Sequence, residues 1–406
     1  MEIIKGGVTA AKGFKAAGIY AGIKKKRKDM ALVYSIIPAK AAGTFTTNVV
    51  KAAPVKWDIK VMKENETAQA VVLNSGVANA CTGTAGDENN YTMAEAVAKS
   101  LGLPVNAVLT ASTGVIGKQL PIDVMTEGAK LLADALADTL ESGLLAAEAI
   151  MTTDTYSKEY AVTFELGDKT VTVGGMSKGS GMIHPNMATM LGVVTTDIAI
   201  SKALLQEAIS ADVKESFNMI SVDRDTSTND SLIVLANGLA GNAEITSKNE
   251  DYDKFCKALN LVTTELAKQM AADGEGATKL FETVVVGAKN KEDAVILSKS
   301  IITSNLVKTA VYGNDANWGR ILCAMGYSGV DFDPDQVDLY IESADGKLKL
   351  VENGMATDYS EETATKILSA KEVRAIADIK AGAGTATAWG CDLTYDYVKI
   401  NADYRS

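Results

Sequence analysis

Apolar positions in the first half of the chain fall mostly into short runs bounded by glycine and polar residues. Runs of this length predict buried strands rather than long helices. The runs that we predict as strands are 30–37, 69–73, 107–110 and 190–194. Apolar and polar residues alternate at 160–166 and 170–173, and the Gly167-Asp168 turn between them predicts a β-hairpin.

Segments with helical periodicity lie between these strands. Residues 87–101 predict a helix that Gly102 stops, because glycine readily adopts the left-handed conformation that ends helices. Residues 121–150 are rich in alanine and predict two or three helices that cover a sheet, with breaks at Gly128 and Gly143.

Two further helices are predicted before the pattern changes near residue 283. Ser201 is placed to cap a helix, and a longer helix is predicted at 249–272. From Thr283 onward, short strands and helices alternate, which is typical of a second, smaller α/β domain. We therefore predict two domains, 1–281 and 282–406.

Composition describes an ordinary globular protein, since 47% of the 406 residues are hydrophobic and 22% are charged. The net charge of -11 argues against nucleic acid as a partner, because neutralising phosphates requires clustered Lys and Arg. A cationic small substrate suits this charge better. No apolar run approaches the length of a membrane span, and the first residues lack the basic and apolar regions of a signal peptide. We expect a cytoplasmic protein without membrane contact.

Cysteine and histidine usage narrows the chemistry further. The four cysteines, Cys81, Cys256, Cys323 and Cys391, are far apart and form no C-x-x-C pair. His184 is the only histidine, so a zinc site built from several histidines is excluded. We expect no metal site, no disulfide framework and no cofactor.

The stretch 178–192 contains the strongest candidate for covalent chemistry, which is Thr189. Its hydroxyl lies where a glycine-, proline- and asparagine-containing loop meets the predicted strand. Attack on the Ala188 carbonyl would give an N-to-O acyl shift, and hydrolysis would leave Thr189 with a free amine as its own base. Two plainer interpretations remain open: Thr189 could simply begin a strand, and His184 could be the base or only shape the turn.

Three other polar stretches could hold ligands. Thr113 and Gly114 follow a predicted strand, where glycine would allow a close approach of the backbone and N–H groups could stabilise an oxyanion, although a plain turn explains them equally. Residues 222–230 could form a ligand loop or a buried hydrogen-bonded turn. In the glycine-rich stretch 273–279, Glu275 would repel phosphate and better suits an ammonium group.

The order of these motifs resembles the ornithine acetyltransferase family, the ArgJ-like glutamate N-acetyltransferases of arginine biosynthesis. The resemblance runs from residues 7–14 to 401–405, and its most specific part is 178–183 followed by 186–191. It implies an αββα layered sandwich of the DmpA/ArgJ-like type with a smaller C-terminal α/β domain.

The same resemblance implies roles for individual residues. Thr189 would be the nucleophile and the bond between Ala188 and Thr189 the self-cleavage point. Thr113 and Gly114 would stabilise the oxyanion. The implied substrate contacts are Thr152, Lys178, Thr189, Glu275, Asn401 and Ser406. Thr153 adjoins Thr152, and an offset of one residue would exchange them.

The reaction implied by the resemblance is transfer of acetyl from N2-acetyl-L-ornithine to L-glutamate with ping-pong kinetics. Acetyl-CoA could serve as a second acetyl donor, which would make the enzyme bifunctional. The expected fragments, 1–188 and 189–406, would stay associated as a tetramer of two copies of each.

Three residues depart from the family pattern. Arg224 stands where glycine is common, and Asn305 stands where proline is usual, so both bear on loop shape. Ser406 replaces a terminal threonine but keeps the hydroxyl. Two rival functions remain: a self-processing amidase or aminopeptidase of the same fold, in which water resolves the acyl-enzyme, and a small-molecule binding protein that never cleaves.

Overall fold

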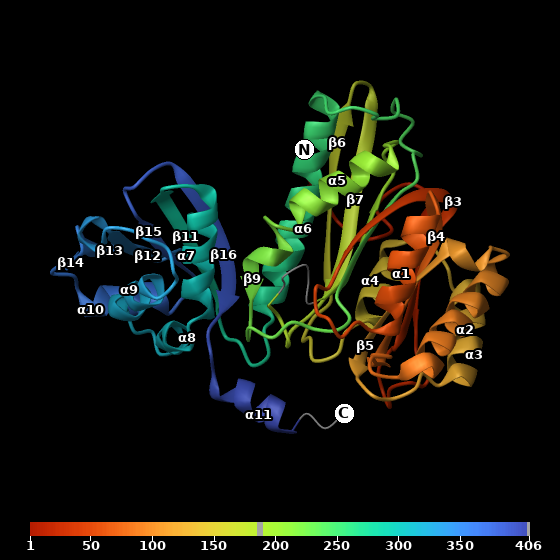
Figure 1. Cartoon of the computed structure of the whole chain (residues 1–406), viewed down its shortest axis with the longest axis horizontal. Coiled ribbons are helices and arrows are strands. Elements are labelled where there is room, and N and C mark those ends of the chain that lie inside the picture. The colour runs from red at the N-terminus through yellow and green to blue at the C-terminus, as the bar shows by residue number, and fades with distance from the viewer. Residues whose placement is uncertain (185–189, 404–406) are drawn as a thin grey trace. The chain divides into compact units, whose positions relative to one another are not determined.

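The computed structural model describes residues 1–184 and 190–403, and its elements group into two compact units (Figure 1). Unit 1 contains Met1–Asn218 and Asp225–Met270. Unit 2 contains Met219–Arg224 and, of the described residues, 271–403. The expected division into domains 1–281 and 282–406 stays a prediction.

Unit 1 is built on one nine-stranded sheet, whose main path has the strand order β1-β6-β7-β8-β10-β3-β4-β5, while β2 pairs with β3. Its strands are β1 (Glu2–Ile4), β2 (Phe14–Ile19), β3 (Met30–Phe45), β4 (Thr67–Val77), β5 (Val108–Val115), β6 (Lys158–Leu166), β7 (Lys169–Lys178), β8 (Leu191–Thr196) and β10 (Ser231–Ala236). Its helices are α1 (Ala53–Glu64), α2 (Gly83–Leu101), α3 (Ile122–Asp134), α4 (Leu140–Ala149), α5 (Lys202–Asp212) and α6 (Glu250–Ala272), the last of which ends in unit 2.

Strand β3 divides this sheet into two halves. Its first part pairs with β2 and β4, and its last part pairs with β10. The register of β3 with β4 shifts between Tyr34 and Ala39, next to Pro38, which cannot donate a ladder hydrogen bond. Buried side chains from both halves then join in one core, to which β4, β5, β8 and β10 contribute Val71, Leu73, Leu109, Val193 and Ile233.

Helices cover the outer face of each half. Met93 of α2 and Met125 of α3 belong to a second core with Met30, Leu32 and Val72 of β3 and β4. On the other half, the side chain of Gln206 on α5 hydrogen-bonds both backbone groups of Gly43 in β3. Helix α6 places Leu266 against Gly175 of β7. The layers are therefore helices, the two halves of the sheet, and helices again. This order confirms the expected αββα sandwich.

Unit 2 contains a seven-stranded sheet of order β14-β13-β12-β15-β11-β16-β9. Its strands are β9 (Ile220–Ser221), β11 (Leu280–Ala288), β12 (Asp338–Ser343), β13 (Gly346–Glu352), β14 (Met355–Ala356), β15 (Glu372–Asp378) and β16 (Gly384–Cys391). The remaining helices are α7 (Lys291–Thr303), α8 (Asn305–Tyr312), α9 (Trp318–Gly326), α10 (Glu361–Leu368) and α11 (Tyr395–Asp403), with single 3₁₀ turns at Val105–Ala107, Phe217–Met219 and Pro334–Gln336.

Several local predictions are confirmed. The hairpin has β6 and β7 paired in register, with Val162 opposite Val173. Ser201 caps α5 by accepting a hydrogen bond from Leu204 N–H, and Gly102 ends α2 in the left-handed region with φ +67°.

The predicted breaks at Gly128 and Gly143 are wrong, because both residues lie inside helices. A Cβ at Gly128 would lie 2.4 Å from Met30 Sδ, and one at Gly143 would lie 2.7 Å from Thr9 Oγ1. These glycines therefore allow the helices to pack closely rather than interrupting them.

Two departures from the family pattern have local explanations. Arg224 has φ +71°, a left-handed conformation that glycine adopts without strain. Asn305 is the first residue of α8, after the N-cap Ser304, which is a position that favours proline. Among the described residues, no single helix is long and apolar enough to cross a membrane, and only α7 and α8 together, bent by 59°, reach that length and hydropathy.

Candidate active site

The predicted oxyanion pair, Thr113 and Gly114, lies within the last residues of β5. The strand continues beyond the predicted 107–110, so Thr113 pairs with Ser75 and Gly114 with Gly76 of β4. Gly114 has φ +127°, and a Cβ there would lie 2.4 Å from the Gly76 carbonyl carbon. Any other residue at position 114 would therefore collide with backbone.

Hydrogen bonds of buried polar side chains hold this end of β5 in place. Ser112 donates from its hydroxyl to Asn74 Oδ1 at 2.7 Å, and Asn74 Nδ2 donates to the Val77 carbonyl at 2.8 Å. Both side chains are fully buried. The backbone that would present an oxyanion-binding N–H is consequently held by hydrogen bonds on two strands.

Two predicted substrate contacts, Thr152 and Lys178, meet at a carboxylate that the sequence did not single out. Asp154 is 2% exposed and accepts hydrogen bonds from Thr152 N–H at 3.0 Å, Gly179 N–H at 2.7 Å and Lys158 Nζ at 2.8 Å. Burial opposes ionisation of Asp154, but the charges of Lys178 and Lys158 and these hydrogen bonds outweigh it and lower its pKa. Asp154 therefore joins the loop of Thr152 to the end of β7.

A further lysine lies in the same group. Lys24, from the segment between β2 and β3, donates to the Met151 carbonyl at 3.0 Å. Burial lowers the pKa of its ammonium to about 8, with Asp29 opposing and Arg27 adding to the shift; Asp154 and Lys178 have smaller effects. Lys24, Lys158 and Lys178 thus lie near Asp154, with Asp29 beside Lys24. The lysines outnumber the two carboxylates, and this excess of positive charge suits an anionic substrate group.

Unit 2 brings together two other predicted contacts. Asn401 of α11 donates from Nδ2 to Oε2 of Glu275 at 2.8 Å, although the residues are 126 positions apart. Glu275 is 9% exposed and precedes Gly276, whose carbonyl accepts a hydrogen bond from Thr394 Oγ1 at 2.7 Å. The amide donor carries no charge, so the Glu275 carboxylate can still bind an ammonium group.

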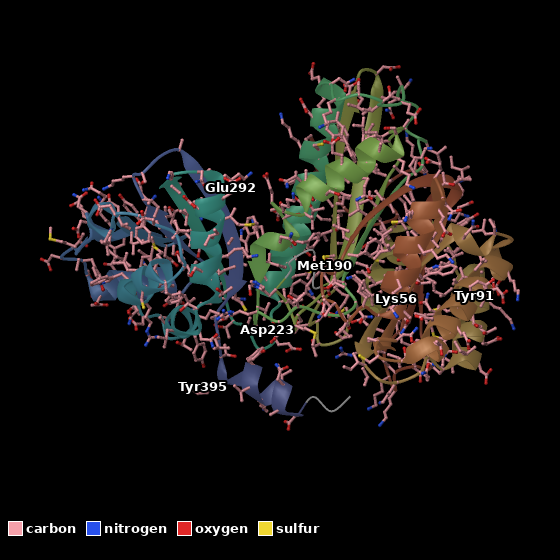
Figure 2. The ribbon with its side chains drawn as sticks, viewed as in Figure 1. Lys56, Tyr91, Met190, Asp223, Glu292 and Tyr395 are labelled. Carbon is pink, nitrogen blue, oxygen red and sulfur yellow. The ribbon has the colours of Figure 1, made fainter. Side chains whose placement is uncertain are left out.

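Three predicted site residues, Ala188, Thr189 and Ser406, lie outside the described residues. The flanks of the cleavage segment, which we define as 185–189, belong to unit 1, as do Thr113, Gly114, Thr152 and Lys178. Met190, labelled in Figure 2, directly follows this segment and is 3% exposed. The roles assigned to all these residues stay predictions.

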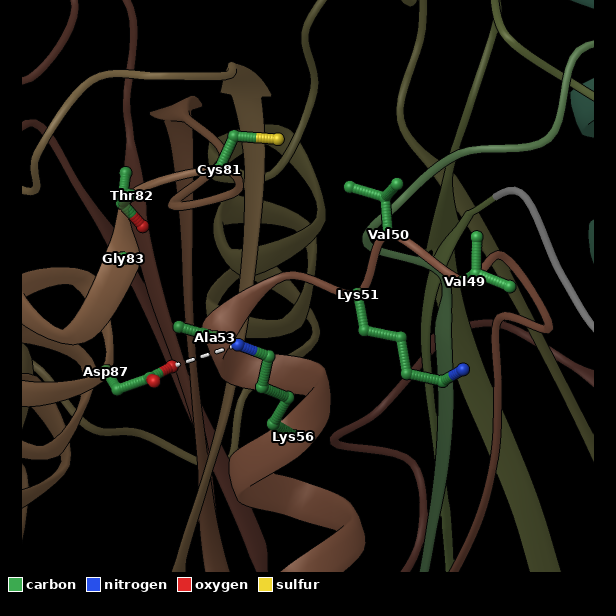
Figure 3. Close-up of a pocket in the computed structure, with 9 residues that line it drawn as sticks. All are labelled: Val49, Val50, Lys51, Ala53, Lys56, Cys81, Thr82, Gly83 and Asp87. Carbon is green, nitrogen blue, oxygen red and sulfur yellow. Dashed lines mark ion pairs between the residues drawn. The ribbon is translucent and has the colours of Figure 1, made fainter.

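A pocket of about 320 Å³ in unit 1 contains none of the predicted residues (Figure 3). It lies where α1 and α2 begin, and Lys56 and Asp87 form an ion pair of 3.5 Å across it. Cys81 is also in its wall and is exposed. In the described parts of the chain, no three His, Cys, Asp or Glu side chains are grouped as metal ligands would be.

Comparison with known proteins identifies the family. The sequence model of the ArgJ family matches residues 15–406, a range that includes every predicted site residue. The chain belongs to the ArgJ family. It is thus an acyltransferase of arginine biosynthesis, as the resemblance implied.

Individual relatives match over their whole length. The chain is 52% identical over 406 residues to the arginine biosynthesis bifunctional protein ArgJ of Caldanaerobacter subterraneus subsp. tengcongensis, covering 100% of both chains. It is 50% identical over 396 residues to the protein of that name from Thermotoga neapolitana, covering 97% of this chain and 99% of the relative. A crystal structure of the argJ protein from Bacillus halodurans matches with a TM-score of 0.50 and 50% identity, covering 52% of this chain and 98% of that one.

Proposed function

We propose that this ArgJ-family chain transfers the acetyl group of N2-acetyl-L-ornithine to L-glutamate through an acetyl ester on Thr189. The products are L-ornithine and N-acetyl-L-glutamate. The observation that carries the proposal is the family match over 15–406, which places every implied site residue inside the matched range.

Self-cleavage prepares the nucleophile. The Thr189 hydroxyl attacks the Ala188 carbonyl, the peptide nitrogen leaves as the Thr189 amine, and water then hydrolyses the resulting ester. The products are fragments 1–188 and 189–406 with a free amine on Thr189. The half-length chain from Bacillus halodurans supports this division, because its match covers 52% of this chain, close to the share that 189–406 would take.

The acetyl transfer proceeds in two balanced steps. The Thr189 amine accepts the hydroxyl proton as the oxygen attacks the acetyl carbonyl, and the proton passes to the departing ornithine amine. Glutamate then attacks the acetyl ester with its own amine, which restores the hydroxyl. Thr113 and Gly114 would stabilise the oxyanion of both tetrahedral intermediates.

Charge complementarity suggests how the substrates are oriented. Both acetylornithine and glutamate carry an α-carboxylate, which suits Lys178 in the cationic group around Asp154. Ornithine also carries a side-chain ammonium, which suits Glu275 beside Asn401. Thr152 and Ser406 complete the proposed contacts.

The proposal also covers a second acetyl donor, cofactors, location in the cell and oligomeric state. The relatives are named bifunctional, which supports acetyl-CoA as a second acetyl donor. We expect no cofactor, a cytoplasmic location, and a tetramer containing two copies of each fragment. Measuring acetyl-CoA:glutamate transfer beside ornithine-dependent transfer decides the second donor, and mass measurement of the native assembly decides the tetramer.

Replacement of Thr189 tests the central step. Thr189→Ala should give one uncleaved, inactive chain, whereas Thr189→Ser retains a hydroxyl and should still cleave. Denaturing gels, intact mass and product formation from acetylornithine with and without glutamate are the measurements. A Thr189→Ala protein with wild-type activity would overturn the nucleophile, and acetate release that glutamate does not alter would instead indicate a hydrolase.

A further inference from the structure

The polar segment Thr226–Asp230, just before β10, has no part in the reaction proposed above. It lies in unit 1, and Asn229 and Asp230 are 6% and 1% exposed. Burying polar side chains is unfavourable unless they find partners. One set of partners, in the segment 46–52, donates hydrogen bonds to the backbone carbonyls of Thr226–Asp230. Other partners, Ser112, His184 and Met190, are close in sequence to the candidate catalytic residues.

Asn229 holds the backbone beside the oxyanion pair. Its Nδ2 donates to the Ser112 carbonyl at 2.8 Å and to the Ala78 carbonyl at 2.6 Å. Its Oδ1 accepts from the Thr228 hydroxyl at 2.6 Å, which fixes the orientation of the amide. The Ser112 carbonyl and the Thr113 N–H belong to one peptide unit, so Asn229 sets the plane in which Thr113 N–H points.

The same segment contacts both sides of the cleavage segment. The Thr226 hydroxyl donates to the His184 carbonyl at 3.0 Å, just before residue 185. On the other side, the Asp230 carboxyl accepts a hydrogen bond from Met190 N–H, and Ser231 N–H donates to the Met190 carbonyl at 2.9 Å. The residues directly before and after the cleavage segment are therefore bound to one short piece of chain.

The carboxyl group of Asp230 makes this contact while it is 1% exposed. Burial raises its pKa well above the ordinary value, although hydrogen bonds from Ser227, Met190 and Thr46 and the charge of Lys178 oppose the shift. Its Oδ2 has no hydrogen-bond partner among the described residues. Asparagine has the same shape as aspartate and keeps an oxygen that can accept from Met190 N–H.

We propose that Thr226–Asp230 is a positioning element that holds the oxyanion pair and both flanks of the cleavage segment in one arrangement, with Asn229 as its principal residue. It deepens the proposed function and rests on it. Self-cleavage and acetyl transfer both require attack within reach of the same oxyanion-binding groups, so one misplaced element should impair both steps.

The decisive comparison is between Asn229→Asp and Asn237→Asp in the full chain. Asn237 is also a buried asparagine of unit 1, and its Nδ2 donates to the Lys12 carbonyl at 2.9 Å, far along the chain from the catalytic candidates. Each replacement keeps the shape, exchanges the amide donor for a carboxyl oxygen and introduces the same ionisable group, so the two variants differ in where the donor is lost. The measurements are the rate of self-cleavage, kcat and KM for acetylornithine, and the thermal unfolding temperature.

We expect Asn229→Asp to slow self-cleavage and to lower kcat by about tenfold or more, while KM changes much less. Asn237→Asp should lose comparable thermal stability while both rates stay within about twofold of wild type. The proposal is overturned if Asn229→Asp folds and keeps wild-type rates, or if Asn237→Asp slows both steps equally. If wild type itself neither cleaves nor transfers acetyl, the proposed function fails instead.

Asp230 supplies a second test that does not depend on the folding of Asn229→Asp. Asp230→Asn should cleave at close to the wild-type rate because the amide keeps the acceptor, whereas Asp230→Ala should be slow. Equal cleavage rates for Asp230→Ala and wild type would overturn the assignment of Met190 to this element. Equally slow cleavage by both variants would contradict the role of Asp230 as a hydrogen-bond acceptor that an amide can replace.

Discussion

Asn401 Nδ2 lies 2.8 Å from Glu275 Oε2, and this hydrogen bond joins two residues that the family pattern implicates separately in substrate binding. One consequence is that their contributions should not be independent. The Asn401 amide hydrogen-bonds one carboxylate oxygen of Glu275 and so fixes the orientation of the carboxylate. Removal of Asn401 should therefore alter what Glu275 can bind.

A double-mutant cycle measures this coupling. We expect Glu275→Ala and Asn401→Ala each to lower kcat/KM for acetylornithine, and the double variant to lose less than the two effects combined. A hydrogen bond to a charged group is worth about 1.5–3 kcal/mol, which sets the expected interaction energy. Additivity within about 0.5 kcal/mol would show that the two residues act separately.

Gly114→Ala should damage the oxyanion pair directly. The added Cβ meets the Gly76 backbone at 2.4 Å, and φ +127° is unfavourable for alanine, so β5 and β4 must move apart. We expect kcat to fall by about 10²–10³, as for loss of an oxyanion donor. Gly117→Ala is the control, because Gly117 also has positive φ, +74°, but no atom within 4 Å of its Cβ position. Equal kcat values for the two variants would argue against the assignment.

Asp154 and Lys158 form a buried ion pair, with neither side chain exposed. Asp154→Asn removes the carboxylate partner of the buried ammonium and should cost about 3–5 kcal/mol of unfolding free energy. The double variant Asp154→Asn/Lys158→Met should regain most of that stability. In both variants the KM for acetylornithine should be higher than in wild type, because no carboxylate at position 154 holds Lys178 in place. A double variant with wild-type KM would limit Asp154 to a structural role.

Asp212 should make the stability of unit 1 depend on pH. It accepts hydrogen bonds from Asn260 Nδ2 and the Ser216 hydroxyl, yet burial raises its pKa to about 6. Between pH 4 and 6 the unfolded chain releases this proton while the folded protein keeps it, so the folded state loses stability as pH rises. The loss is about 3 kcal/mol at 1.4 kcal/mol per pKa unit, and it is complete above pH 6.

Asp212→Asn removes the titrating group and keeps an acceptor. Denaturant unfolding of wild type and variant from pH 4 to 8 gives the difference in free energy at each pH. We expect wild type to weaken relative to the variant up to about pH 6 and the difference to be constant thereafter. A difference that stays constant over the whole range would show that Asp212 ionises normally.

Local signals predicted much of the fold correctly. The β6–β7 hairpin, the Ser201 cap and the Gly102 stop depend on neighbouring residues alone, so the sequence contains them. Gly128 and Gly143 misled the prediction because their role is decided by Met30 and Thr9, which are distant in sequence.

The same distinction applies to the site. Thr113 and Gly114 could be proposed from the sequence because a glycine after a strand is a visible signal, and their role stays a prediction. Asp154 and Asn229 could not, since an isolated acid or amide in a polar loop says nothing about its partners. Asn229 reaches Ser112 across 117 positions. For residues 222–230, the contacts of Thr226, Asn229 and Asp230 favour the buried hydrogen-bonded turn over a ligand loop.

The strand order of the unit 1 sheet also bears on what self-cleavage leaves behind. Strands β8 and β10 come from after residue 189, yet they lie between β7 on one side and β3 on the other, both from before residue 188. The ladder pairs Lys178 with Leu191, one on each side of the proposed cleavage point. Each fragment supplies strands that the other would otherwise leave with exposed edges. Fragments 1–188 and 189–406 would therefore share one sheet, and separating them would require unfolding that sheet.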